Sequence, residues 1–188
     1  MAPFKNFFNK SDSNKRRNSN EVVYESKLPD YIDAANKIYN KEYDAALVEL
    51  KQQLENANPN DIENLSMIHI NLMQAYFKNR SNAEYYFALS THHAKEALKF
   101  GHNTGLAAFR IIANLEKERK FKQAIEVCQV VTSKDYHFSK FGYKQKPEFH
   151  ERMAKLKLKL EKYGDDSSDS FLTDQEKALI IKNSQRGK

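Results

Sequence analysis

The chain of 188 residues has room for one ordinary domain with flanking segments. Charged residues make up 30% and hydrophobic residues 40% of the sequence, and no apolar run approaches the ~20 residues that cross a bilayer. The single cysteine, Cys128, excludes an internal disulfide and favours a reducing compartment, and the N-terminus lacks the apolar stretch of a secretory signal. The sequence therefore predicts a cytoplasmic protein.

The net charge of +6 is unevenly distributed along the chain. Residues 28–64 contain 3 Lys or Arg against 8 Asp or Glu, whereas residues 100–163 contain 14 against 7. Such a gradient along an elongated molecule would steer charged partners or favour head-to-tail packing. Solvated helix faces in a lysine-rich protein are the simpler explanation.

Residues 1–27 are predicted to be a disordered basic tail, because Asn, Ser and Lys dominate them. Three aromatic residues at its start, Phe4, Phe7 and Phe8, lie among basic residues. This combination is compatible with weak contact to an anionic membrane or with docking to another protein, and also with a tail that has no function. A stable membrane anchor needs more apolar area.

Residues 28–163 have an apolar spacing that is helical almost throughout, which predicts one all-α domain. The segment 58–61 (Asn-Pro-Asn-Asp) is a break followed by a capping acid, and Gly101 is a helix end. Pro147 suits the first turn of a last helix that Gly164 ends. These signals predict helix pairs at about 30–57, 62–100 and 104–133, followed by a helix at 147–163.

The helix expected at 147–163 has one apolar and one lysine-rich face. Its apolar stripe consists of Phe149, Met153, Leu156, Leu160 and Tyr163. A helix of this design suits the end of a stack, so we expect it to cap the domain. Residues 164–188 then read as an acidic, serine-rich linker and a short amphipathic tail from about residue 173 to 181. The serine run is either a spacer or a phosphoacceptor segment.

Two segments begin a helix in the same way, with an aromatic residue followed by a small one. Tyr43 precedes Ala46, and Phe121 precedes Ala124. Ser90 aligns with these two alanines, 34 residues before Ala124 and 44 after Ala46. We expect each small residue to lie where two helices approach closely.

This pattern resembles the tetratricopeptide repeat, whose period is 34 residues, over roughly residues 30–131. The sequence departs from the family in having no Trp and about ten extra residues around its middle copy. The resemblance implies antiparallel helix hairpins stacked in a right-handed superhelix with a C-terminal capping helix. It also implies a non-enzymatic scaffold or adaptor that holds a peptide or helix of a partner in a concave groove.

Some members of that family bind a partner's terminal carboxylate with Asn, Lys and Arg side chains of the groove. The alignment places Asn71 and Arg110 at two of the five groove positions. The other three positions hold Tyr31, Ala35 and Leu106, which depart from the pattern. A complete clamp is therefore not expected. Arg110 with Asn71 would still favour an acidic partner. Alternatively, the two are polar residues on a solvent-exposed helix face and bind no partner. The aromatic residues near these positions, Tyr31, Tyr76, Phe77 and Phe109, are expected to pack in the core.

No catalytic or metal-binding constellation is recognisable in the sequence. The six histidines match no metal motif, and the adjacent His92 and His93 point in different directions on a helix. Cys128 falls on the apolar stripe of a helix, where a thiol behaves as a small hydrophobic group. We therefore expect no enzyme activity, no metal and no cofactor.

Two other functions remain as alternatives to a peptide-binding scaffold. The basic region 100–163 would suit a nucleic-acid-binding protein, although lysines alternate with glutamates at 116–122 and no base-stacking platform is recognisable. The opposite charges of the two ends would suit a self-assembling structural protein. The oligomeric state does not follow from the sequence.

Overall fold

A computed structural model of the chain describes residues 31–79, 83–101, 104–138 and 145–186. This described part contains eight helices and no strand, which confirms the predicted all-α class. The basic tail 1–27 lies outside it. The helices are α1 (Tyr31–Tyr39), α2 (Tyr43–Asn56), α3 (Ile62–Lys78), α4 (Ala83–Phe100), α5 (Thr104–Lys117), α6 (Phe121–Thr132), α7 (Lys146–Tyr163) and α8 (Asp174–Ser184).

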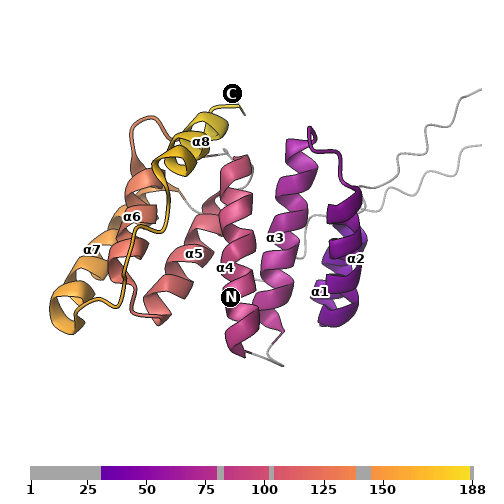
Figure 1. The fold of residues 1–188 in the computed structure, drawn as a ribbon, viewed down its shortest axis with the longest axis horizontal. Helices are drawn as coiled ribbons and strands as arrows, with labels where there is room; N and C mark the ends of the chain where they lie inside the picture. Colours follow the sequence, from indigo (N-terminus) through magenta and orange to yellow (C-terminus); the bar gives the residue numbers. More distant parts are fainter. Residues whose placement is uncertain (1–30, 80–82, 102–103, 139–144, 187–188) are drawn as a thin grey trace, which may run out of the picture.

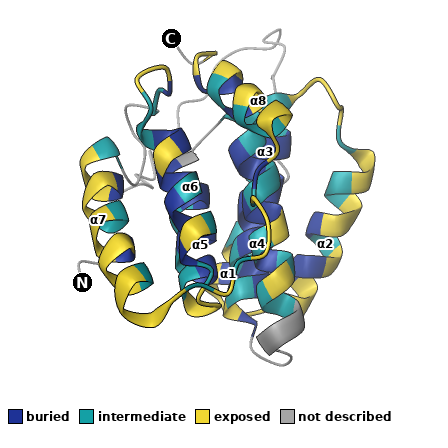
Figure 2. Ribbon diagram, turned by 60° about the vertical axis from the view of Figure 1, so that its left-hand side comes forward, coloured by how far each residue is buried: buried dark blue, intermediate teal, exposed yellow. Residues whose placement is uncertain are grey.

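The helices α1 to α7 follow one another along the long axis of the molecule, and each contacts the next one in sequence (Figure 1). Contact between α1 and α3 adds a link across the first pair. Helices whose apolar stripes cannot be buried alone complete each other's core in such a stack. Figure 2 shows the result, with buried residues facing the inside of the stack and exposed residues on the outer sides of α2 and α7.

The helix boundaries follow local signals that are visible in the sequence. Asp61 caps α3, because its carboxylate accepts a hydrogen bond from the Asn64 N–H at 3.1 Å. Pro147 lies in the first turn of α7. Gly101 and Gly164 follow the ends of α4 and α7 with φ of 85° and 72°, values that favour glycine.

The turns between α1 and α2 and between α5 and α6 have the same backbone geometry. Lys41 and Arg119 both adopt a positive φ, 69° and 58°. The next residue in each turn, Glu42 or Lys120, donates its N–H to the carbonyl five residues earlier at 2.9 Å. Two non-glycine residues in a conformation that side chains disfavour show that the same hairpin turn is built twice.

The core consists of two groups of buried side chains that meet at α3. One joins α3 to α1 and α2, and the other joins it to the helices from α4 to α8. Ile68 and Leu72 of α3 belong to the first group, whereas Ile70 and Met73 belong to the second. Because α3 packs against neighbours on two sides, the residues from Ile68 to Met73 are buried in succession, including the polar His69 and Asn71.

The three small residues expected at close helix contacts are all fully buried. Ala46, Ser90 and Ala124 have no exposed surface. Ser90 shows how near the helices are, because its hydroxyl donates to the backbone carbonyl of Met73 in the neighbouring helix at 2.9 Å. A larger side chain at such a position would have to push two helices apart.

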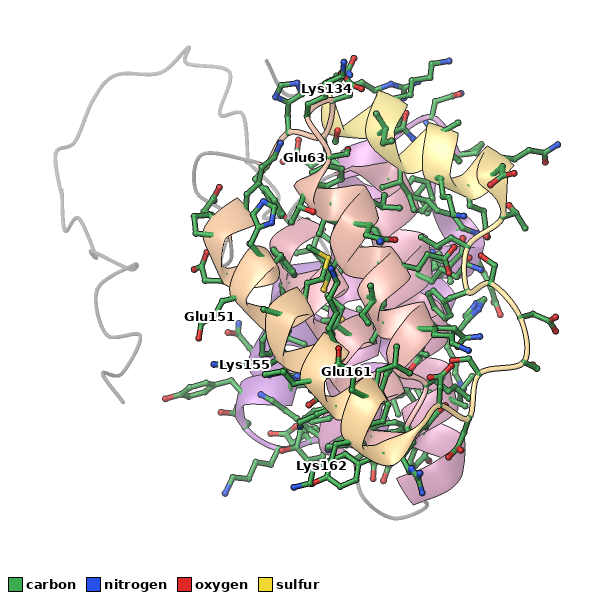
Figure 3. All side chains as sticks on the ribbon, turned by 90° about the vertical axis from the view of Figure 1, so that its left-hand side faces the viewer. Glu63, Lys134, Glu151, Lys155, Glu161 and Lys162 are labelled. Atoms are coloured by element: carbon green, nitrogen blue, oxygen red, sulfur yellow. The ribbon has the colours of Figure 1, made fainter. Side chains whose placement is uncertain are left out.

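The expected apolar stripe of α7 is present except at its last member. Phe149 and Leu156 are buried, and Met153 and Leu160 are half-buried against the core. Tyr163 was expected to complete the stripe, but its side chain is 51% exposed. It is the last residue of α7, where the chain turns away at Gly164. In Figure 3 the charged residues Glu151 and Lys155 mark the outer side of α7.

The chain after α7 returns across the stack instead of leaving it. Residues 164–173, which we call the strap, run back along α6, and α8 then contacts α4 and α6 (Figure 1). Figure 3 shows α7 on one side of α6, with the strap and α8 on the other. Leu172 and Ile180 are fully buried there. The sequence indicated a helix near this position but not where it would pack.

Candidate partner-binding surface

Arg110, one of the two residues predicted for the groove, lies against an aromatic ring at the end of α3. Its guanidinium carbon is 3.3 Å from the centre of the Phe77 ring. Lys117, two turns further along α5, has its ammonium 5.4 Å from the centres of both Phe77 and Phe87. We call Arg110, Lys117, Phe77 and Phe87 the cation–aromatic cluster. Attraction between each cation and the negative face of a ring holds it in place.

The helices α3, α4 and α5 bring this cluster together. Phe77 comes from the last turn of α3, Phe87 from the second turn of α4, and both cations from α5. Both rings and the Arg110 side chain are half-buried, whereas Lys117 is exposed. Phe77 was expected in the core. Its half-buried ring instead supports two positive charges at the surface.

Asn71, the second predicted residue, is used within the fold. Its side chain is buried, and its amide Nδ2 donates to the backbone oxygen of Tyr31 at 3.2 Å, which ties α3 to α1. Arg110 of α5 contacts Phe77 in the last turn of α3, whereas Asn71 lies in the middle of α3. The structure therefore gives these two residues separate contacts. Lys117 and Phe87 are members of the cluster that sequence reasoning missed, since their meeting depends on how α4 and α5 pack.

Two cations of α7, the next basic helix along the stack, share one carboxylate of α5. Glu116 of α5 forms ion pairs with Arg152 and Lys159 of α7. Its side chain is only 13% exposed, so the ion pairs that link the two helices are largely shielded from solvent. The positive charge of the 100–163 region is consequently not uniform. It is reduced at the contact between α5 and α7, where Arg152 and Lys159 share the Glu116 carboxylate.

A second polar feature, the histidine pair of α3 and α4, is buried. The Nδ1 atoms of His69 and His93 lie 3.0 Å apart, so one ring donates and the other accepts. Burial lowers the pKa of His69 to about 4 and that of His93 to about 3. Tyr76 stacks on His93 and Phe100 stacks on His69. Both histidines are therefore neutral at ordinary pH and link the two helices.

The described residues offer no evident reactive centre. Cys128 is fully buried, and burial raises the pKa of its thiol to about 12, which keeps it protonated and unreactive. Within these residues, no three His, Cys, Asp or Glu side chains are grouped as a metal site requires. Along the same part of the chain, no helix has the length and apolar content needed to cross a membrane.

The fold and the cluster together define a class, an all-α protein of successively packed helices with a cation–aromatic surface. Comparison with protein-family models, with curated proteins and with solved structures finds no match.

Proposed function

We propose that this chain is a non-enzymatic protein-interaction scaffold, built as a tetratricopeptide-like array, that binds an acidic peptide or helix of a partner. Two observations support the repeat architecture. The turns at Lys41 and Arg119 share one backbone geometry, and the small residues Ala46 and Ala124 that follow them are fully buried. Helical arrays of this kind present side chains of successive helices on one extended surface.

The observation that carries the proposal is the stacking of Arg110 on Phe77. Stacking occupies the face of the guanidinium, whereas its N–H groups lie in its plane, the direction from which a carboxylate binds through two hydrogen bonds. The ring also fixes the arginine in one orientation, so less conformational entropy is lost on binding. Lys117 adds a second positive charge beside the same ring. The cluster thus favours a carboxylate.

Asn71 supports this site indirectly under the proposal. Its hydrogen bond to Tyr31 fixes α1 against α3, the helix that carries Phe77. We assign direct recognition of the partner to Arg110 and Lys117.

Peptide binding fits the cluster better than nucleic-acid binding does. A base would have to stack on an aromatic face, and the guanidinium of Arg110 already covers a face of Phe77. Several cations of the basic region are also paired with acids, as Lys120 is with Glu118 and Lys155 with Glu151. A phosphate backbone needs many unneutralised charges in a row.

The proposal is tested by titrating the full chain with a fluorescent Glu-rich helical peptide and with a counterpart in which Lys replaces Glu. We expect the acidic peptide alone to bind. Arg110→Ala should weaken it at least tenfold, about 1.4 kcal/mol, because a fixed two-point contact is lost. The melting temperature should stay unchanged. Arg110→Lys should recover only part of the affinity, since an ammonium is a point charge.

Lys134→Ala is the matched control, because it removes one exposed positive charge at the far end of α6 (Figure 3). It should leave the affinity within twofold of the parent. If Lys134→Ala and Arg110→Ala lose the same affinity for the acidic peptide, the effect comes from net charge alone. Arg110 would then not belong to the site. Tighter binding of a single-stranded oligonucleotide than of the acidic peptide would favour the nucleic-acid alternative. Affinity capture with the parent and the Arg110→Ala chain then identifies the natural partner.

A further inference from the structure

The strap is held on the stack by side chains that bind its backbone. The Gln123 amide donates to the carbonyl of Asp169 at 2.7 Å, and the Lys95 ammonium donates to that of Phe171 at 2.9 Å. At its beginning, the Asp165 carboxylate accepts the N–H of Lys122 at 3.0 Å. These contacts fix an irregular segment along α6 and α4, and α8 follows directly from it.

Glu126 of α6 is the centre of this attachment. Its carboxylate accepts hydrogen bonds from the Ser170 hydroxyl and from the N–H of Phe171, the latter at 2.8 Å. It also pairs with the ammonium of Lys177 in α8 at 2.8 Å. Although burial alone would raise its pKa, hydrogen bonds from Lys177, Ser170 and Phe171 lower the pKa of Glu126 below its usual value. One negative charge thus contacts both the strap and α8, which is also attached by the ion pairs of Glu176 with Lys95 and Lys99.

We propose that Ser170 is a phosphorylation site, and that its phosphorylation releases the strap and α8 from α4 and α6. A serine/threonine kinase would transfer the γ-phosphoryl group of ATP to the Ser170 Oγ. The bond between the bridging oxygen and the γ-phosphorus breaks, the Oγ–P bond forms, and the hydroxyl proton and ADP leave. This inference does not depend on the cation–aromatic cluster.

The surroundings of the Ser170 hydroxyl explain why a phosphate would disrupt its contact with Glu126. The oxygen lies beside the Glu126 carboxylate and 2.9 Å from the carbonyl oxygen of Leu172, and both of these are acceptors. Phosphorylation removes the donor and adds a charge of about −1.5 to −2. The interaction with Glu126 changes from a hydrogen bond to repulsion between like charges. The loss of this contact also weakens the attachment of Phe171 and Lys177, which share the same carboxylate.

Ser170 is accessible, and its neighbours suit one class of kinase. The residue is exposed and lines an open cavity of about 360 Å³, which Lys95 and Lys120 also line. Acidic residues precede it at Asp166 and Asp169 and follow it at 174 and 176. A kinase that selects acidic surroundings would recognise this segment. Release would uncover the apolar surface of α4 and α6 that Leu172 and Ile180 now cover.

The test uses the full chain with phosphoserine incorporated at position 170, examined by amide hydrogen exchange. We expect exchange in residues 171–186 to become at least tenfold faster, while α5 and α6 exchange as in the unmodified chain. Phosphoserine at the exposed Ser168, two residues away, is the matched control and should leave exchange in α8 unchanged. An equal acceleration from Ser168 would overturn the proposal, because it would reflect total charge. Slower exchange would also overturn it, since the phosphate would then be bound by Lys95 or Lys120.

The variant Glu126→Gln tests whether repulsion between the phosphate and the Glu126 carboxylate, and not a general loosening of the strap, causes the faster exchange. The amide of glutamine carries no charge and can donate to a phosphate, so phosphorylation of Ser170 should accelerate exchange less than threefold in this variant. The same acceleration as in the parent background would overturn the role of Glu126. Treatment of the full chain with ATP and an acid-directed kinase, followed by mass spectrometry, should place phosphate on Ser170. Modification confined to Ser167 and Ser168 would contradict the assignment of the site.

Discussion

Gly101 and Asn183 lie so close together that a side chain at Gly101 would overlap the backbone of α8. A Cβ atom there would be 2.5 Å from the Asn183 carbonyl oxygen and 2.6 Å from its carbonyl carbon. Asn183 in turn donates its side-chain amide to the carbonyl of Lys99 at 2.7 Å, which satisfies a carbonyl in the last turn of α4. The ends of α4 and α8 are therefore in direct contact. Glycine at position 101 permits both the positive φ of the turn and the close approach of α8.

Gly101→Ala should destabilise the protein more than Gly164→Ala does. Both glycines have a positive φ, so each substitution costs about 1–3 kcal/mol in backbone strain. A Cβ at Gly164 meets nothing within 4 Å, whereas one at Gly101 meets α8 and adds about 1–3 kcal/mol of overlap. Denaturant unfolding of both variants measures the difference. Equal losses would show that α8 does not pack tightly on Gly101.

Ala124→Leu should lower the free energy of unfolding by about 1–3 kcal/mol, because the site is fully buried between helices. Ala45→Leu provides the control, since Ala45 is exposed on α2 and should change stability by less than about 0.5 kcal/mol. Thermal and denaturant unfolding check both values. If the two variants unfold alike, the close helix contact at Ala124 does not exist.

The histidine pair predicts a loss of stability between pH 6.5 and pH 4. His69 and His93 have folded-state pKa values of about 4 and 3, below the ordinary 6.5. Unfolding therefore takes up protons in this range, so the stability present above pH 6.5 falls as the pH is lowered. The slope approaches about 1.4 kcal/mol per pH unit for each histidine. Denaturant unfolding at a series of pH values measures it.

His93→Gln keeps a polar side chain at the buried site and should remove about half of this slope. Carboxylates with lowered pKa values do not contribute to the slope of stability against pH above pH 4.5. Burial alone would raise the pKa of Glu176. Hydrogen bonds from Thr173, Lys95 and Lys99 outweigh this effect and lower that pKa to about 2. Its contribution is lost only as the pH falls below the ordinary value of about 4.5. An unchanged slope in His93→Gln would mean that other groups cause the pH dependence.

Glu116→Gln should weaken the attachment of α7 to α5. The carboxylate pairs with Arg152 and Lys159, and its loss leaves two cations without their counter-charge. Because Lys159 is nearly half exposed, we expect only about 1–2 kcal/mol of destabilisation, decreasing with added salt. Lys155→Ala breaks the exposed pair with Glu151 on the same helix and should cost less than about 0.5 kcal/mol. Unfolding at low and high salt compares the two, and similar costs would mean that the Glu116 pairs contribute no more than a surface pair.

The helices of this protein were predictable because their signals are local. Apolar residues at helical spacing, the cap at Asp61, Pro147 and the glycines at 101 and 164 each act within one or two turns of the chain. The burial of Ala46, Ala124 and Cys128 also followed from the stripe on which each lies. A helix has to bury its apolar stripe whatever neighbour it finds.

The candidate surface was predictable only in part. Arg110 was singled out from its position in a repeat, but its contact with Phe77 and the arrival of Phe87 and Lys117 were not foreseen. Asn71 was assigned to the same groove, and its amide instead binds the backbone of Tyr31. A sequence pattern places a residue on a face of a helix. It does not say which group from another helix will reach that residue first.

By itself, the sequence determined an all-α chain, the ends of several of its helices, and which small residues lie inside it. The tertiary structure decided that His69 meets His93, that Glu116 links α5 to α7, and that the C-terminal segment packs back on α4. Helix formation depends on residues three and four apart, which a sequence displays directly. These contacts instead join residues that are far apart in the chain, 84 residues in the bond from Asn183 to Lys99. They form only when packing of the apolar faces has fixed how the helices lie against one another.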